Sequence, residues 1–166
     1  LNKPIDKNVV CLMPWMHMHI WPNGDTFPCC MSSNDQVFGN THKQSINQIA
    51  NNENFKNIRR QMLAGEKPKA CTRCYELETS ADSWTLRKNS LESFKNHLDL
   101  FEHTQEDGSI PEFKMYYMDI RFSNLCNMRC RTCGPDLSST WYDDQIKLHP
   151  DYPKSKFIDL KSNPFF

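Results

Sequence analysis

The sequence has 166 residues, with 20 Lys+Arg against 20 Asp+Glu, so its formal net charge is zero. This length is typical of one ordinary domain or two small ones. A neutral charge without a basic run argues against nucleic-acid binding. No apolar stretch approaches the roughly 20 residues of a membrane helix, and no signal-like segment precedes Cys11. We therefore expect a cytoplasmic protein with no nucleic-acid or membrane partner.

The first half of the chain predicts a β-hairpin and two helices. A strand over 15–21 and a return strand over 26–31 are joined at Asn23-Gly24, because this pair tolerates the positive φ of tight hairpins. Ser45 is the expected N-cap of a helix over 46–51. A second helix is expected over 52–64, with Gly65 as its C-terminal stop.

A cysteine pair and a longer helix follow in the middle of the chain. Pro68 is expected to end helical structure, which places Cys71 and Cys74 in a loop or tight turn. A helix over 82–100 carries apolar residues at intervals of seven and buries a narrow stripe. Residues 102–112 lack apolar periodicity and form the best boundary candidate.

The second half predicts the beginning of a βα series. We expect a strand over 113–122, a loop over 123–135 with three cysteines, a helix over 137–147 and a further strand over 156–160. Strand, loop, helix and strand in this order are typical of a parallel sheet.

Cys126, Cys130 and Cys133 lie in the loop after the predicted strand, where α/β folds gather ligand sites. Thiolates favour iron–sulfur clusters or zinc. A structural zinc site needs four closed ligands, whereas a four-iron cluster held by three cysteines leaves one iron open to another molecule. Three cysteines therefore favour an open cluster, with a zinc knuckle as the alternative.

Residues 126–133 resemble the CxxxCxxC motif of the radical S-adenosylmethionine (radical SAM) superfamily, and the flanking residues 121–125 and 134–135 strengthen the likeness. The resemblance implies a partial (β/α) barrel whose [4Fe–4S] cluster, on Cys126, Cys130 and Cys133, binds SAM. It implies an enzyme that cleaves SAM reductively to a 5′-deoxyadenosyl radical for hydrogen abstraction. Thr132 occupies a position near the adenine that is commonly aromatic in the family, so it is the implied SAM contact.

Cys11, Cys29, Cys71 and Cys74 form the second group, with two cysteines at the hairpin and two in a later CxxC. This pattern resembles the twitch domain, a shortened SPASM domain, and implies an auxiliary [4Fe–4S] cluster on these four residues. A Cys₄ zinc ribbon is the alternative. Cys30 points to the opposite strand face from Cys29 and is expected to be a small buried residue, or to replace Cys29 if the register differs.

Disulfides are disfavoured for all eight cysteines. Pairs separated by two or three residues close strained loops, and no secretory context is visible. Eight cysteines in 166 residues also fall below the roughly 8–10% of a disulfide scaffold.

Other candidate residues receive a plainer interpretation. His17 and His19 can chelate a metal in principle, but no acidic partner is identifiable, and a packed strand face is favoured. The segment Tyr75-Glu76-Leu77-Glu78 after the CxxC can cap or orient the site, and Arg73 can lie near a cluster's charge, but all are favoured as surface residues.

The expected fold is a small α+β iron–sulfur domain followed by the first βα unit of a truncated partial TIM-like barrel. The expected domains are 8–82 for the auxiliary cluster, 83–112 for a helix and linker, and 113–166 for the start of the barrel. We expect an N-terminal fragment that does not turn over alone. Its expected partners are a reductant such as flavodoxin or ferredoxin and a peptide or small-molecule substrate. The alternatives are a non-catalytic zinc-binding interaction module and an iron–sulfur electron carrier.

Overall fold

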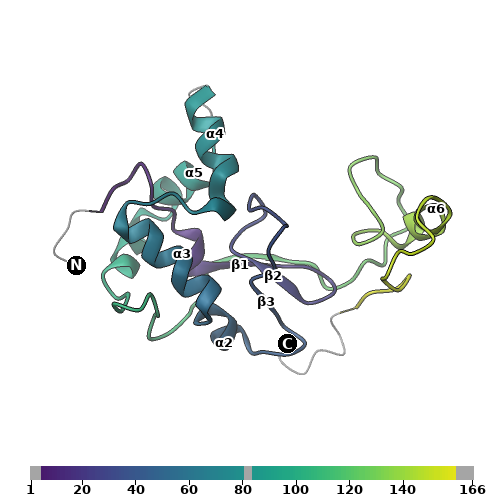
Figure 1. The fold of residues 1–166 in the computed structure, drawn as a ribbon, viewed down its shortest axis with the longest axis horizontal. Coiled ribbons are helices and arrows are strands. Elements are labelled where there is room, and N and C mark those ends of the chain that lie inside the picture. Colours follow the sequence, from purple (N-terminus) through teal and green to yellow (C-terminus); the bar gives the residue numbers. More distant parts are fainter. Residues whose placement is uncertain (1–4, 81–83, 160–166) are drawn as a thin grey trace.

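The computed structural model describes residues 5–80 and 84–159, which contain a four-stranded sheet with helices around it (Figure 1). The strands are β1 (His17–Ile20), β2 (Asp25–Phe27), β3 (Gly39–Asn40) and β4 (Tyr117–Ile120). The α-helices are α1 (Met13–Met16), α2 (Ile46–Ala50), α3 (Glu53–Ala64), α4 (Thr72–Ser80), α5 (Leu86–Ser93) and α6 (Tyr142–Leu148). The 3-10 helices are η1 (Lys69–Cys71), η2 (Lys95–Phe101) and η3 (Ser139–Trp141). Among the described helices, none has the length and apolar character needed to cross a membrane.

The sheet has the strand order β3-β2-β1-β4 and mixes antiparallel with parallel pairs. β1 and β2 form the predicted hairpin, with His19 opposite Phe27, and Gly24 in the turn has a φ of 83°. β4 runs parallel to β1 on its other side, with Ile20 opposite Ile120. The small α+β fold with a hairpin and helices is thus confirmed, while the partial barrel stays a prediction.

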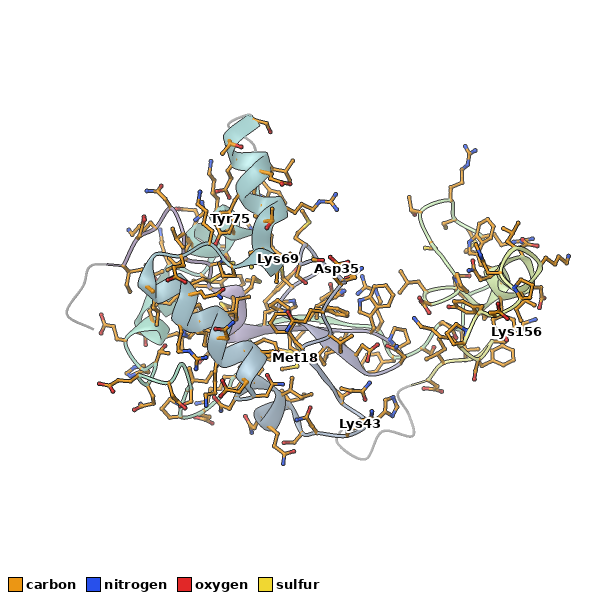
Figure 2. The ribbon with its side chains drawn as sticks, viewed as in Figure 1. Met18, Asp35, Lys43, Lys69, Tyr75 and Lys156 are labelled. Carbon is orange, nitrogen blue, oxygen red and sulfur yellow. The ribbon has the colours of Figure 1, made fainter. Side chains whose placement is uncertain are left out.

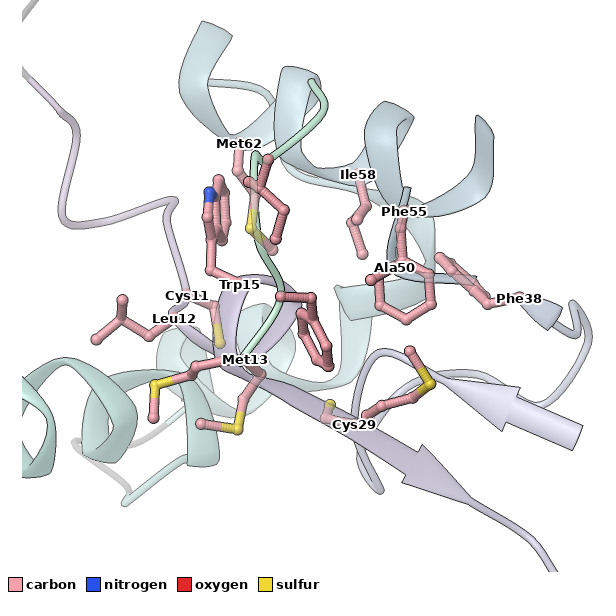
Figure 3. Close-up of a cluster of buried hydrophobic side chains, with 14 of the residues drawn as sticks. Cys11, Leu12, Met13, Trp15, Cys29, Phe38, Ala50, Phe55, Ile58 and Met62 are labelled. Atoms are coloured by element: carbon pink, nitrogen blue, oxygen red, sulfur yellow. The ribbon is translucent and has the colours of Figure 1, made fainter. Parts of the chain in front are cut away.

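The core lies between β1 and α3. Met18, near the middle of the sheet in Figure 2, belongs to the same buried cluster as Phe55, Ile58 and Met62 of α3. Figure 3 shows these three side chains reaching from α3 toward the turn that carries Trp15. The core therefore anchors α1, which Leu12 alone separates from Cys11.

The two predicted helices of the first half are confirmed. Ser45 and Gln48 form a capping box at the start of α2. Asn52 Oδ1 accepts hydrogen bonds from the backbone N–H groups of Asn54 and Phe55 at the start of α3. Gly65 ends α3 in the left-handed conformation, with a φ of 82°. These ends are encoded locally, which explains why the sequence predicts them.

Two glycines with positive φ give a matched stability test. Gly65 has no neighbouring atom where a Cβ would lie, whereas a Cβ on Gly108, whose φ is 85°, would overlap the carbonyl group of Lys56. We expect Gly65→Ala to lower the free energy of unfolding by about 1 to 2 kcal/mol through backbone strain alone. Gly108→Ala should cost about 1 to 3 kcal/mol more because of overpacking. Chemical denaturation of both variants measures the difference, and equal costs would contradict the predicted overlap.

The hairpin strands are shorter than predicted. The residues before His17 form the helical turn α1, because the cap N–H of His17 bonds to Met13 O and Trp15 N bonds to Leu12 O. β2 ends at Phe27, since Pro28 has no N–H for the strand ladder. Gly39–Asn40 pairs with β2 as the short edge strand β3.

The prediction of a loop or tight turn at Cys71 and Cys74 is wrong. Cys71 ends η1, and Cys74 lies in the first turn of α4. Pro68 does not end a helix either, because α3 already ends at Gly65. It is the N-cap of η1, with a φ of −62°.

The predicted single helix over 82–100 is divided. Asp82 and Ser83 lie outside the described residues, α5 ends at Ser93, and η2 follows with a kink at His97. Phe94 and His97 pack their rings against Tyr117 and Tyr116 respectively. These tertiary ring contacts favour the divided structure over the continuous helix that the seven-residue pattern predicts.

The segments predicted as a linker and as the start of a barrel both pack onto the first part of the chain. Ile110 and Phe113 are buried members of the core cluster, and β4 joins the same sheet as the hairpin. The helix predicted over 137–147 is divided into η3 and α6. The strand predicted over 156–160 is wrong for its described residues, because residues 156–159 form no strand and the pairing of Asp159 with Ser123 is an isolated antiparallel bridge; Leu160 lies outside the description.

Candidate metal centre

Four cysteines from three separate segments line one small, largely apolar pocket. The lining residues are Cys11, Cys29, Cys71 and Cys74, together with Met31, Leu86 and Arg87. Cys11, Cys29 and Cys74 are buried, and Cys71 is half-buried. The structure therefore brings together all four cysteines of the predicted auxiliary site.

Local structure fixes each of these thiols. Cys11 lies just before α1, and its Sγ is 3.5 Å from Ser90 Oγ of α5. Cys29 lies in a turn closed by hydrogen bonds from the Ser32 N–H and hydroxyl to Cys29 O. Ser33 N donates to Ala70 O at 3.0 Å and so ties this turn to η1, where Cys71 lies. The hairpin end and the CxxC helix are thus joined beside the pocket.

Burial makes the free thiols poor acids. It raises the pKa of Cys11 to about 11 and raises the pKa values of Cys29, Cys71 and Cys74. Thiols with such pKa values are protonated at neutral pH, and a bound metal must displace their protons. Four sulfurs are the donor set of iron–sulfur clusters and of zinc sites, but within the described chain these thiols do not converge closely enough to hold a single metal ion.

Backbone N–H groups oppose this effect of burial at three of the thiols. Hydrogen bonds from Met13 to Cys11, from Met31 to Cys29, and from Leu86 and Arg87 to Cys74 lower the respective pKa values. Hydrogen bonds to sulfur stabilise the thiolate form and are one means by which proteins tune iron–sulfur centres. These hydrogen bonds offset part of the effect of burial, although the pKa values of the three thiols stay raised.

An ion pair in the pocket wall was not predicted from the sequence. Arg87 and Glu78 have side chains that are 5% and 10% exposed, and they pair across the gap between α4 and α5. Tyr75 lies beneath the Arg87 guanidinium and donates from its hydroxyl to Val9 O at 2.6 Å; Figure 2 places Tyr75 near the base of α4. The sequence analysis missed Arg87 and favoured Tyr75 and Glu78 as surface residues, which is wrong because Tyr75 is buried and the Glu78 side chain nearly so. A signal was available, since these are opposite charges at either end of a short connection.

Cys30 and Arg73 lie outside the pocket. Cys30 is exposed, so its expected burial is wrong, while Cys29 faces the pocket. Arg73 is exposed, as the sequence analysis expected, and lines a separate polar hollow with Glu76 and Lys69. The hairpin end turns between Cys29 and Cys30 and gives the two thiols different surroundings.

The second cysteine group lies in a loop organised by a buried asparagine. Asn124 is fully buried, and its Nδ2 donates to Pro135 O at 2.8 Å and to Lys156 O at 2.9 Å. Its Oδ1 accepts from Ile158 N at 2.8 Å. Asn124 thus joins both ends of the loop to the segment after α6, in the lobe that Figure 1 shows apart from α4 and α5.

The three thiols of this loop are more accessible than the first four. Cys126 and Cys133 are half-buried, Cys130 is exposed, and Thr132 is also exposed. Met128 N donates to Cys126 Sγ at 3.4 Å, and Trp141 Nε1 of η3 donates to Cys130 O at 3.2 Å. Across the described chain, no three His, Cys, Asp or Glu side chains converge closely enough to hold a single metal ion.

His17 and His19 are buried on β1, in agreement with the expected packed strand face. His19 nevertheless has an acidic partner, which the sequence did not reveal. His19 Nδ1 lies 2.8 Å from Asp119 Oδ2, and Arg121 Nη1 lies 3.1 Å from His19 Nε2. His17 Nδ1 lies 2.8 Å from Tyr117 O. Burial lowers the pKa of both histidines. The parallel β1–β4 pairing supplies all these partners.

One comparison with known proteins matches the part of the chain that carries the first cysteine group. Residues 11–75 match the family model of the SPASM domain, an iron–sulfur cluster-binding domain. The matched segment contains Cys11, Cys29, Cys71 and Cys74 and covers less than half of the 166 residues. No curated protein and no solved structure matches the chain. The match supports iron–sulfur cluster binding by this part of the chain.

Proposed function

We propose that this chain is part of a radical SAM enzyme with one auxiliary [4Fe–4S] cluster. The observation that carries the proposal is the pocket lined by all four cysteines of the SPASM match. A second thiol group follows the carboxyl end of the parallel strand β4, and its CxxxCxxC spacing resembles the radical SAM motif.

The two thiol groups would have different tasks. Cys11, Cys29, Cys71 and Cys74 would hold the auxiliary cluster with complete protein ligation. This favours electron transfer or structural stabilisation over direct chelation of substrate. Cys126, Cys130 and Cys133 would hold the second cluster and leave one position for SAM. When bound, that cluster and SAM supply reductive cleavage and hydrogen abstraction.

The loop residues would orient this second site. Asn124 fixes the two ends of the loop, while Ser138 Oγ and Thr140 Oγ1 both donate to Met128 O, at 2.6 and 2.8 Å. Met128 N in turn donates to Cys126 Sγ at 3.4 Å and so holds this sulfur against the loop backbone. Thr132 is exposed beside Cys133 and is the proposed SAM contact. The proposed partners are a low-potential reductant, such as flavodoxin or ferredoxin, and a peptide or small-molecule substrate.

Anaerobic reconstitution with iron and sulfide tests the proposal. We expect a brown protein with iron and sulfide for two clusters, about eight iron atoms per chain. Addition of SAM should change the electron paramagnetic resonance (EPR) spectrum of the reduced protein. The Cys130→Ser/Cys133→Ser variant should lose this response, and Cys30→Ser should keep it.

Two alternatives predict different results. A zinc-binding interaction module would give a colourless protein with stoichiometric zinc, and this outcome would overturn the proposal. An iron–sulfur electron carrier would bind clusters but show no spectral response to SAM. The zinc alternative rests on the same four-sulfur donor set, whereas the iron–sulfur assignment has the support of the SPASM match.

A further inference from the structure

Arg87 places a positive charge in the wall of the pocket that holds the first four thiols. Its residue is only 4% exposed and lines the pocket beside Cys11 and Cys74. A charge fixed in a poorly solvated wall is screened much less than one on the surface. Arg87 is therefore well placed to act electrostatically on any group bound by the thiols.

All three nitrogen atoms of the Arg87 guanidinium donate hydrogen bonds. Nε lies 3.0 Å from both Glu78 carboxylate oxygens, and Nη2 donates to Glu78 Oε2. Nη1 donates to Lys7 O at 2.6 Å and to Val10 O at 3.2 Å. The side chain thus links α5 to α4 and to the segment that leads into Cys11, so its charge cannot move away from the pocket.

The Arg87–Glu78 pair is oriented with respect to the pocket. Arg87 belongs to the pocket lining within the described chain, whereas Glu78 does not. Glu78 follows Cys74 by one turn of α4 and is also held by the hydroxyl of Thr85. Beside the effect of burial, the Arg87 charge lowers the pKa of the Cys11 thiol, whereas at Cys74 the Glu78 charge, which raises the pKa, acts more strongly than the Arg87 charge. The two fixed charges therefore act on the thiols in opposite directions.

We propose that Arg87 is a positioning residue that raises the reduction potential of the centre held by Cys11, Cys29, Cys71 and Cys74, and that Glu78 moderates this effect. The inference rests on the proposed auxiliary cluster. Reduction adds one electron and hence one negative charge to the centre, and a nearby fixed cation stabilises the more negative state. Loss of the cation should lower the potential, whereas loss of the Glu78 charge should raise it.

The test is a redox titration of the reconstituted 166-residue chain with dithionite, followed by EPR. At a fixed potential we expect Arg87→Gln to lower the ratio of reduced to oxidised auxiliary centre at least tenfold, which corresponds to about 59 mV for a one-electron couple. Glu78→Gln should raise that ratio, and Arg87→Lys should fall between Arg87→Gln and the unsubstituted protein. Arg73→Gln, which removes the same charge from an exposed position on α4, should change the ratio less than twofold.

Opposite shifts for the Arg87 and Glu78 variants are the critical result, because a merely structural role would move both in the same direction. Shifts of equal sign, or unchanged potentials in both variants, would overturn the inference. If Arg87→Gln fails to retain iron, the sign of the Glu78→Gln shift decides. Absence of iron from the unsubstituted chain would instead overturn the proposed function, and this inference with it.

Discussion

Simultaneous replacement of Cys71 and Cys74 by alanine is expected to remove the auxiliary cluster and about half of the bound iron, roughly four atoms per chain. Both thiols line the pocket with Cys11 and Cys29. Two remaining ligands on separate segments cannot complete a four-iron centre. Iron and sulfide analysis after anaerobic reconstitution measures the loss.

The other cysteines of the chain supply the controls. Cys30→Ala removes an exposed thiol next to Cys29 and should retain the full iron content. Cys130→Ala/Cys133→Ala should remove the other half of the iron and leave the auxiliary signal. An unchanged iron content in the Cys71→Ala/Cys74→Ala variant would remove these residues from the proposed ligand set.

Trp15→Ala is expected to lower the free energy of unfolding by about 3 to 5 kcal/mol, the range for large aromatic truncations in a core. Trp15 is only 1% exposed. It packs edge-on against Phe101 with a centroid distance of 4.8 Å, and its Nε1 donates to Thr104 Oγ1 at 2.7 Å. Such a loss is a large fraction of the roughly 5 to 15 kcal/mol typical of whole domains.

Two smaller changes separate packing from hydrogen bonding at this position. Trp15→Phe keeps most of the ring contact with Phe101 and loses the bond to Thr104, while Thr104→Val removes the same bond from the other side. Each should cost about 1 kcal/mol from the lost hydrogen bond, with a further packing cost for Phe. Denaturant unfolding of the metal-free variants measures these differences. A cost below about 1 kcal/mol for Trp15→Ala would contradict its central place in the core.

The parts of the fold that the sequence predicts have strong local signals. Ser45, Asn52 and Gly65 encode helix ends in their own side chains or backbone freedom, and Asn23-Gly24 encodes a turn. Such features depend on neighbours within a few residues, so one sequence suffices to recognise them. The grouping of the four pocket cysteines came instead from the resemblance of their pattern to the twitch domain.

The parts that the sequence does not predict depend on distant contacts. The kink at His97 follows from ring packing against Tyr116, and Asp119 becomes the partner of His19 only because β4 pairs with β1. Arg87 is held beside the thiol pocket by hydrogen bonds to the carbonyl groups of Lys7 and Val10, which lie about eighty residues earlier in the chain. Periodicity and propensity carry no information about such pairs.

The parallel pairing of β1 with β4 has a consequence for the order of folding. His17 lies opposite Tyr117 across 100 residues of sequence, whereas His19 meets Phe27 across a short turn. Because closing a long loop costs more chain entropy than closing a short one, the hairpin can form early and the β1–β4 edge only late. During synthesis from the N-terminus, β1 must therefore emerge with one edge uncovered until residues 117–120 arrive. That interval is when the nascent chain is most exposed to mispairing with other strands.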